Sequence, residues 1–388
     1  MAAPKLRFKE FDKAFSRNTI KELAKIYVGR DLVEDAYSPI KTETHIYPIY
    51  SNSVDNEGLY GYYNFEEFNF DDDALTVVGR GAGLGKAFYR QGGFGTIGRL
   101  LSLTPKDKSF HPKYLSDYIN DKLIIHNESG GIPQLPRSSL ENYEVVLPSY
   151  EEQTKIASFL SNVDEKISQL TQKHQLLSQY KQGMMQKLFS QQIRFKVDDG
   201  SEFGEWEEKI LSELFDYANG KSFEAEVVEN GKFKLITLNS IDIKANLKKV
   251  HKTISNSDNS LIKNDLIMIL SDVAHGNFLG LTAIIPDNSY VLNQRVGRLR
   301  SRSEINIVFI RFYINFNQKY FKLNGQGSSQ LNLSKADILN FPVSLPCIEE
   351  QTKIANFLSA IDQKIEVVAQ QIEQAKTWKK GLLQQMFV

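Results

Sequence analysis

Basic side chains gather in two acid-poor stretches of this chain. The first spans 20 residues without any acidic side chain and contains Arg80, Lys86, Arg90 and Arg99. The second spans 17 residues with one acid and contains Arg295, Arg298, Arg300, Arg302 and Arg311. Because lysine and arginine neutralise phosphates, either stretch could hold the backbone of a nucleic acid. The alternative interpretation is that these side chains alternate along strands and face solvent.

A glycine-rich run at residues 79–86 overlaps the first stretch. Its spacing fits neither of two common nucleotide-binding patterns. A phosphate-binding loop requires glycine where Arg80 stands and a hydroxyl where Ala87 stands. A dinucleotide fingerprint requires glycine at Leu84 or Lys86. We therefore interpret the run as a flexible loop between two strands, which leaves Arg80 and Lys86 free to contact phosphates.

The sequence shows no recognisable catalytic or metal-binding pattern. It lacks an Asn-Pro-Pro-aromatic tetrad for adenine methylation, a His-Glu-x-x-His zinc motif and a Gly-x-Ser-x-Gly nucleophile elbow. The six histidines are scattered, and the single cysteine, Cys347, excludes internal disulfides and thiolate-rich zinc sites. We therefore expect no catalytic residue, no metal site and no cofactor in this chain.

Length and composition indicate a protein of two domains with connectors. The chain has 388 residues, 41% of them hydrophobic, which is enough for a core in each half. Its 47 basic and 47 acidic residues balance, so any affinity for nucleic acid would depend on local patches. No apolar run reaches the roughly 18–20 residues of a membrane span, and the N-terminus has no apolar signal core. We expect a cytoplasmic protein without a membrane partner.

The candidate basic residues lie in a chain that repeats itself. Residues 147–167 read LPSYEEQTKIASFLSNVDEKI and residues 345–365 read LPCIEEQTKIANFLSAIDQKI, with 15 of 21 positions identical. The repeats lie 198 residues apart. Such a repeat indicates one structural unit that occurs twice, and hence a pseudo-two-fold molecule.

Each repeat opens a long helical pattern, over residues 151–189 and 349–387. A seven-residue apolar spacing continues through both, which is typical of a coiled coil. The expected contact positions are Ile156, Leu160, Val163 and Ile167 in the first helix, and Ile354, Leu358, Ile361 and Ile365 in the second. A helix of this length would span roughly 58 Å. Lys181 and Lys379 interrupt the two seams at equivalent places. Either they specify the register of the pair, or the helices have left the seam by then.

The repeat divides the chain into residues 1–148, 149–192, 193–346 and 347–388. The two globular blocks, 1–148 and 193–346, resemble each other loosely and carry strand-like runs and a late helical pattern, so we expect mixed α/β structure. Shared marks occur in the same order: a basic-aromatic tag (6–9 and 193–196), a short amphipathic segment (20–23 and 211–214), a glycine–basic pair (29–30 and 220–221) and a closing Gly/Ser-rich loop (129–135 and 325–331).

The order of blocks, the repeated phrase and its closing Lys-x-Gly-x-x-Gln resemble the specificity subunit of type I restriction–modification enzymes. The resemblance covers the whole chain. Residues 291–296 (VLNQRV) and 331–334 (LNLS) are similar to common phrases of the target-recognition domains in that family. The first block departs from the pattern, because Gly95-Thr96-Ile97-Gly98 stands where Asn-Gln is expected.

The resemblance implies two target-recognition domains of mixed α/β structure, separated by two long antiparallel coiled-coil helices. Each domain would read one half of a bipartite double-stranded DNA target, and the helices would set the gap. It also implies docking of two methyltransferase subunits, which supply S-adenosylmethionine and the catalytic residues, and later of two restriction/translocase subunits. The chain alone would be no enzyme. Two alternatives stay open: a stand-alone DNA-binding regulator that dimerises through its coiled coils, and a fused nuclease with an unrecognised active site.

We expect the DNA-binding residues in the basic loops and in the Gly/Ser-rich loops, where glycine leaves room for a close backbone. The candidates are Arg30, Arg80, Lys86, Arg90, Gly130, Lys221, Asn293, Arg295 and Ser328.

Overall fold

The computed structural model describes residues 4–69, 73–127, 130–273 and 276–388. It divides into two compact units. Unit 1 comprises Met1–Lys173 with Val368–Val388, and unit 2 comprises His174–Val367. Among the described residues, no helix combines the length and the hydropathy that crossing a lipid bilayer requires.

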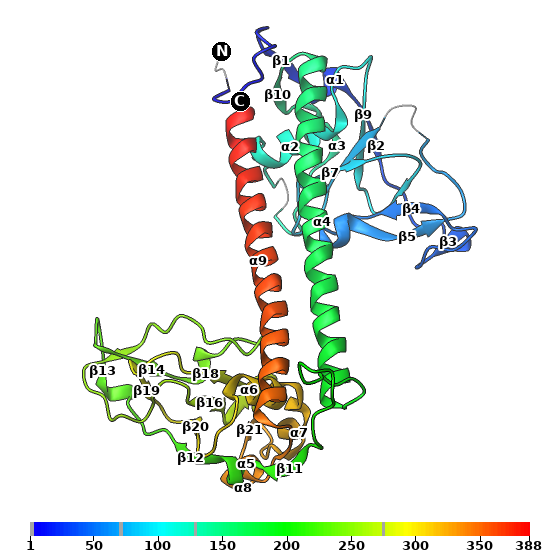
Figure 1. Cartoon of the computed structure of the whole chain (residues 1–388). Helices are drawn as coiled ribbons and strands as arrows, with labels where there is room; N and C mark the ends of the chain where they lie inside the picture. Colours follow the sequence, from blue (N-terminus) through cyan, green and yellow to red (C-terminus); the bar gives the residue numbers. More distant parts are fainter. Residues whose placement is uncertain (1–3, 70–72, 128–129, 274–275) are drawn as a thin grey trace. The chain divides into compact units, whose positions relative to one another are not determined.

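Unit 1 is built on a four-stranded antiparallel sheet that one helix covers (Figure 1). In spatial order the strands are β2 (Ala24–Val28), β9 (Leu101–Pro105), β6 (Ala74–Val77) and β7 (Ala87–Arg90). The covering helix, α2 (Pro112–Lys122), packs on β6 and β7. Leu75 and Val77 are buried in one core with Tyr114 and Leu115 of this helix, so apolar burial holds the two layers together.

Unit 1 contains a second, smaller sheet. Its order is β3 (Tyr37–Ser38), β5 (Leu59–Tyr63), β4 (Tyr47–Tyr50) and β8 (Gly95–Thr96), with β4 and β8 parallel. A further antiparallel pair consists of β1 (Ser16–Thr19) and β10 (Glu144–Leu147). The short helix α1 (Ile20–Leu23) follows β1, and the short helix α3 (Arg137–Glu141) precedes β10.

Unit 2 repeats this topology. Its larger sheet has the order β12 (Phe215–Asn219), β20 (Val296–Ser301), β16 (Leu266–Ile269) and β18 (Thr282–Ile284). Its smaller sheet has the order β13 (Val227–Val228), β15 (Thr253–Ile254), β14 (Phe233–Ile236) and β19 (Tyr290–Leu292), with β14 and β19 parallel.

The remaining elements of unit 2 follow the same plan. The strand pair β11 (Glu207–Ile210) with β22 (Pro342–Leu345) corresponds to β1 with β10. The helices α5 (Leu211–Leu214), α6 (Ile307–Phe316) and α8 (Lys335–Leu339) correspond to α1, α2 and α3. Unit 2 adds α7 (Gln318–Asn324) and the pair β17 (Ser271–Val273) with β21 (Gln330–Asn332). The mixed α/β fold with an internal repeat, predicted from the sequence, is confirmed.

The two long helices begin and end within one residue of their predicted limits: α4 spans Tyr150–Phe189 and α9 spans Ile348–Met386. Each unit contains a part of each helix. Six of the predicted seam residues are buried: Ile156, Leu160, Val163, Ile354, Leu358 and Ile361. The other two, Ile167 and Ile365, are partly buried against the same cores.

Two equivalent ion pairs join α4 to α9. In unit 2, Lys181 Nζ lies 2.6 Å from Asp362 Oδ1 and 5.0 Å from the centre of the Phe312 ring. In unit 1, Lys379 Nζ lies 2.6 Å from Asp164 Oδ1. Each partner of the second pair stands 198 positions from its counterpart in the first, and the crossed pairing shows that the helices are antiparallel. Each lysine thus reaches an acid on the other helix, and a role of the two lysines in specifying register stays a prediction.

The repeated phrase also fastens each block to its helix through a buried carboxylate. Glu350 is fully buried and accepts hydrogen bonds from the Arg194 guanidinium at 2.7 and 3.2 Å and from the Trp206 indole at 3.1 Å. Glu152 in unit 1 is 1% exposed and accepts two bonds of 2.8 Å from Arg7. The arginines come from the two basic-aromatic tags, so the tags are structural.

The glutamine that follows each of these carboxylates ties the helix to its own block. Gln153 and Gln351 are buried, and each side-chain amide donates to the carbonyl of the proline that precedes its helix. Their Oε1 atoms accept from the backbone N–H of His111 and of Asn306, just before α2 and α6. The repeated residues therefore satisfy the polar groups of a junction that occurs twice.

Candidate nucleic-acid interface

Each block presents its glycine–basic pair against a neighbouring backbone. Arg30 forms a parallel bridge with Ile97, and Lys221 forms the equivalent bridge with Asn293. A Cβ on Gly220 would lie 1.9 Å from the carbonyl oxygen of Asn293, so this approach requires glycine. The side chains of Arg30 and Lys221 are exposed at this edge, and Lys221 has Asp258 3.9 Å away. The two glycine–basic pairs noted in the sequence therefore occupy equivalent places in the two blocks.

A second basic residue stands at an equivalent place in each block and has an unusual backbone. Arg99 has φ 68° and Arg295 has φ 66°, both in the left-handed region that non-glycine residues seldom adopt. Backbone hydrogen bonds hold them there, from Arg99 N to Gly29 O and from Leu270 N to Arg295 O. Both side chains are exposed. Strain of this kind, kept in both copies, often marks a functional position.

A third equivalent pair opens the short helices α3 and α8. Arg137 and Lys335 are both exposed. Each follows a segment that pairs with the equivalent part of its block: in unit 1 Gln134 forms an isolated bridge with Arg80, and in unit 2 β21 pairs with β17. In unit 1 the side chains of Arg80, Arg99 and Arg137 line one cavity of about 290 Å³. Glu141 neutralises part of this charge, because its Oε1 lies 2.7 Å from Arg137 Nε.

The glycine-rich run is a loop between strands, as predicted. It leaves β6 after Val77 and enters β7 at Ala87. Arg80 and Lys86 are exposed on it. The side chain of Asn52 fastens its first residue, since Oδ1 accepts from Gly79 N at 2.8 Å. The loop therefore carries two exposed basic side chains, and a hydrogen bond fixes the position of its first residue.

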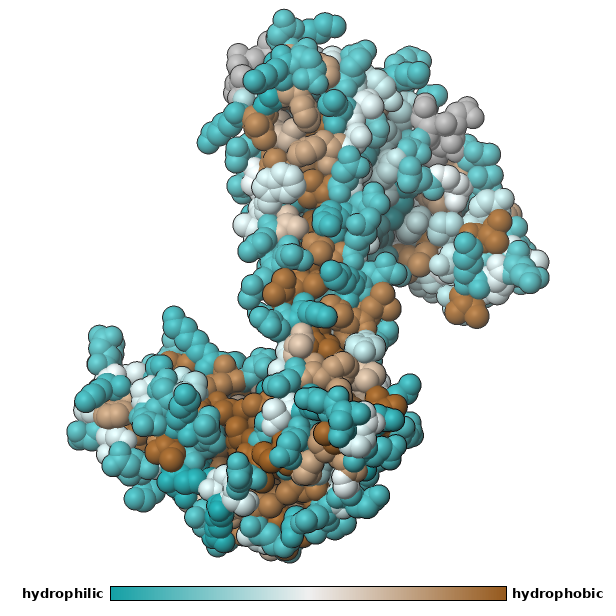
Figure 2. Space-filling model, in the orientation of Figure 1, coloured by the Kyte–Doolittle hydropathy of each residue, from teal (hydrophilic) through white to brown (hydrophobic). Residues whose placement is uncertain are grey.

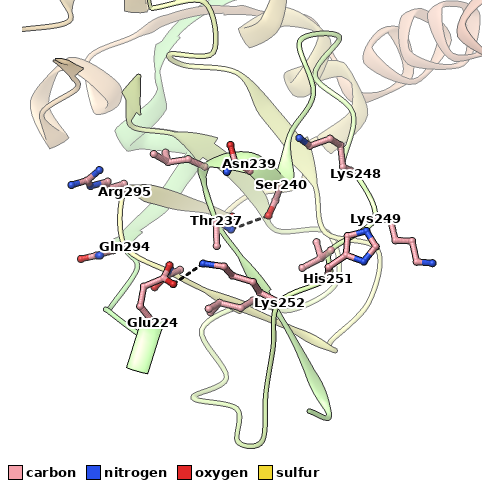
Figure 3. A pocket seen from close by; sticks show the side chains of 14 residues that line it. Glu224, Thr237, Asn239, Ser240, Lys248, Lys249, His251, Lys252, Gln294 and Arg295 are labelled. Carbon is pink, nitrogen blue, oxygen red and sulfur yellow. Dashed lines mark hydrogen bonds and ion pairs between the residues drawn. The ribbon is translucent and has the colours of Figure 1, made fainter. Parts of the chain in front are cut away.

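Unit 2 contains a cleft of about 760 Å³ in front of its smaller sheet (Figure 3). Its walls are the helical turn at Leu238–Ser240, the segment 248–252 that leads into β15, and the loop 293–295 after β19. Its ionisable lining residues are Lys248, Lys249, His251, Lys252, Arg295 and Glu224. Four permanent cations and one carboxylate favour a polyanionic ligand.

Two predicted DNA contacts do not reach the surface in this structure. Arg90 is 3% exposed, its guanidinium donates to Thr76 and to the Glu57 carbonyl, and it stacks 3.5 Å above the Tyr50 ring. Burial lowers the pKa of this guanidinium. The role of Arg90 is thus structural.

Asn293 is the second of these residues. It is 2% exposed, accepts from the backbone N–H of Phe223 at 3.0 Å and donates to Glu224 at 2.9 Å. Its side chain therefore positions the carboxylate of the cleft and cannot reach a base from this place.

The crowded arginines near residue 300 mostly have acidic or buried surroundings. Arg300 pairs with Asp265 at 2.7 Å, and Arg302 pairs with Asp216. Arg311 is partly buried, and desolvation lowers the pKa of its guanidinium. Ion pairs and partial burial therefore describe Arg300, Arg302 and Arg311, whereas Arg295 is exposed and lines the cleft.

The Gly/Ser-rich loops were also expected to approach DNA. Gly130 and Ser328 are exposed, and an added Cβ on Gly130 would meet nothing within 4 Å. Ser129 of the first loop lies outside the described residues. Gly130 and Ser328 are therefore accessible, and their contact with DNA stays a prediction.

Several residues of the candidate interface were not among those predicted. Arg99 was visible as part of the acid-free stretch, but only the fold pairs it with Arg295. The segment 248–252 contains three lysines in five positions, and this density was an available signal. Arg137 and Lys335 stand alone in the sequence, so nothing local could have identified them.

A protein-family model described as the type I restriction modification DNA specificity domain matches this chain twice, at residues 14–179 and 204–377. The specificity subunit of the type I restriction enzyme MjaVIII from Methanocaldococcus jannaschii is 28% identical over 342 residues, which is 82% of this chain and 79% of the relative.

Solved structures support the fold. The crystal structure of a type I restriction–modification S subunit from M. genitalium aligns with a TM-score of 0.68 at 18% identity, over 100% of this chain and 99% of that chain. A chain from a structural study of type I restriction–modification assembly and conformational transition aligns with a TM-score of 0.58 at 13% identity, over 97% and 98%.

Proposed function

Because the chain belongs to the type I restriction modification DNA specificity family, we propose that it recognises a bipartite DNA target, with each globular block contacting one half. The observation that carries the proposal is the internal equivalence of the basic positions. Two copies of one fold each present a basic residue at three matching sites: Arg30 with Lys221, Arg99 with Arg295, and Arg137 with Lys335. Phosphate contacts of this kind orient a protein on DNA without reading sequence.

The surroundings of these shared positions differ between blocks, which suits two different half-sites. In the first block Arg80 is exposed and lines the same cavity as Arg99. In the second block the residue equivalent to Arg80 is Ser271, which is buried. The segment that leads into the middle strand of the smaller sheet contains Asp55 and Glu57 in the first block and lysines at 248–252 in the second. Base readout depends on such local chemistry in the grooves.

The four segments 1–148, 149–192, 193–346 and 347–388 would then be the functional modules. The helices α4 and α9 act as the spacer whose length sets the unread gap between half-sites. Readers that face the same side of B-DNA sit about one helical turn, roughly 34 Å, apart. A helix of 40 residues is long enough to define such a separation.

The helices also provide the docking surface for two methyltransferase subunits, which supply S-adenosylmethionine and flip the target adenine, and restriction/translocase subunits join that complex. The repeat supports this part, because two equal partners require two equal surfaces. Apolar side chains remain visible on the surface along the long helices (Figure 2). Tyr180 and Trp378 occupy the same repeat position, 198 residues apart, and are 51% and 54% exposed.

Family membership favours this proposal over a free-standing regulator that dimerises through its coiled coils. The experiment is binding of the complete methyltransferase to a bipartite duplex and to a scrambled one at several salt concentrations. We expect Arg295→Ala to lower affinity for both duplexes, since its side chain would contact phosphate, and to reduce the salt slope by about one. A self-associating chain that binds DNA without methyltransferase subunits and does not associate with them would favour the regulator.

A further inference from the structure

The cleft of unit 2 is built around a short chain of hydrogen-bonded side chains. Buried Asn293 donates to Glu224 Oε1 at 2.9 Å, and Glu224 Oε2 lies 2.7 Å from Lys252 Nζ. Figure 3 shows Lys252 pointing towards Glu224 between the walls, while Lys248 and Lys249 lie farther along the rim. The lysine and the carboxylate are about half exposed, so a ligand could reach both.

The backbone of the lysine-rich wall is fixed at both ends. Lys248 N donates to Ser240 O at 2.8 Å, and Leu235 N donates to Lys252 O at 2.9 Å. Ser240 itself accepts from Thr237 N. Lys248, Lys249 and Lys252 therefore project from an ordered segment, and less conformational freedom is lost when they bind an anion.

The first block has the opposite charge at the matching place. β5 and β15 are equivalent because each pairs antiparallel with the two neighbouring strands of its smaller sheet. The residues that lead into β5 include Asp55 and Glu57, and residues 55–61 contain no lysine, arginine or histidine. The Glu57 side chain is 71% exposed, and Arg90 Nη1, 3.5 Å from its carboxylate, offsets part of its charge, so Asp55 is the stronger source of repulsion. A phosphate that the lysines would attract would be repelled here.

We propose that the cleft of unit 2 is a clamp for phosphates of the DNA backbone, at a place where the first block has acidic residues in place of the lysines. This inference rests on the proposed DNA-recognition function. Lys248 and Lys249 contact phosphates directly. Glu224 holds Lys252 in the cleft and limits its attraction for the backbone, because the carboxylate neutralises the ammonium group.

The test is equilibrium binding of the complete methyltransferase, assembled with this chain, to cognate and scrambled duplexes across a salt series. In Lys248→Ala/Lys249→Ala the slope of log affinity against log salt should fall by about two for both duplexes, since each phosphate contact contributes roughly 0.9. Between roughly 50 and 200 mM salt the variant should therefore lose about twelvefold less affinity than the unmodified complex. Glu224→Gln should act oppositely and steepen the slope by up to about one.

The charge-matched control is Lys319→Ala/Lys322→Ala on α7, outside the cleft, which should leave the slope unchanged. An unchanged slope in the Lys248/Lys249 variant, or an equal fall in the control, would overturn the clamp. So would a loss confined to the cognate duplex, because that result assigns the cleft to base reading. Failure of the unmodified complex to bind any duplex would instead refute the proposed function.

Discussion

Removing Arg194 should destabilise unit 2 far more than removing an exposed arginine. Its guanidinium makes two of the three hydrogen bonds to Glu350, whose side chain is fully buried, and its own side chain is 22% exposed. Arg194→Ala therefore leaves a buried carboxylate with Trp206 as its remaining donor among these partners. Arg302, which pairs with Asp216 where both side chains are more than half exposed, offers a matched control.

The magnitude follows from the two environments. Leaving a buried charge without its partner costs about 3–5 kcal/mol, and the retained indole bond places Arg194→Ala near the lower end, about 3 kcal/mol. Arg302→Ala should cost about 0–1 kcal/mol, because solvent screens an exposed pair. Arg194→Ala/Glu350→Gln should recover at least about 1 kcal/mol relative to Arg194→Ala, since it no longer buries an unpaired charge.

The assay is urea unfolding of the full chain followed by tryptophan fluorescence. The chain has two tryptophans. In a Trp378→Phe background, Trp206 is the single reporter, and it sits beside the perturbed carboxylate. Equal stabilities of Arg194→Ala and Arg302→Ala, or a double variant less stable than Arg194→Ala alone, would refute the reasoning from the buried pair.

Three further predictions follow from the repeat. Arg99→Ala and Arg295→Ala should each reduce the salt slope of DNA binding by about one, measured in the complete methyltransferase; a change for only one of them would break their equivalence. Lys181→Asp should destabilise the chain by about 0.5–1 kcal/mol in urea unfolding, and Asp362→Lys added to it should restore most of the loss, unless the pair does not set register. Trp378→Ala should weaken association with methyltransferase subunits by at least about tenfold in pull-down titrations, with unaltered unfolding.

The long helices could be predicted almost to the residue because their signal is long and redundant. Apolar positions recur every seven residues over both segments, so a single substitution such as Lys181 does not hide the pattern. Its partner Asp362 could not be predicted, because pairing across two helices depends on register, which the spacing alone leaves open. The repeat of the phrase could be read directly, whereas the roles of Glu152 and Glu350 needed the fold that buries them.

The candidate interface was only partly predictable, because charge in a sequence says nothing about burial. Arg80 and Arg90 look alike within the same acid-free stretch, yet one lies on an exposed loop and the other is covered by Tyr50. Strands of two to six residues also give weak periodic signals, so the equivalence of Arg99 and Arg295 required the observed topology. The local sequence pattern was enough to predict the basic loops. Which basic side chains share a surface depends on how the strands pair, and the sequence alone does not show that pairing.

The most direct test of the account is to exchange one globular block and read the methylated sites. Residues 1–148 would be replaced by the same block of a relative with different specificity, and the methylome of cells that express the complete system would be sequenced. We predict that one half of the bipartite target changes while the other half and the gap stay the same. A change in both halves, or methylation at unaltered sites, would contradict the assignment of one half-site to each block.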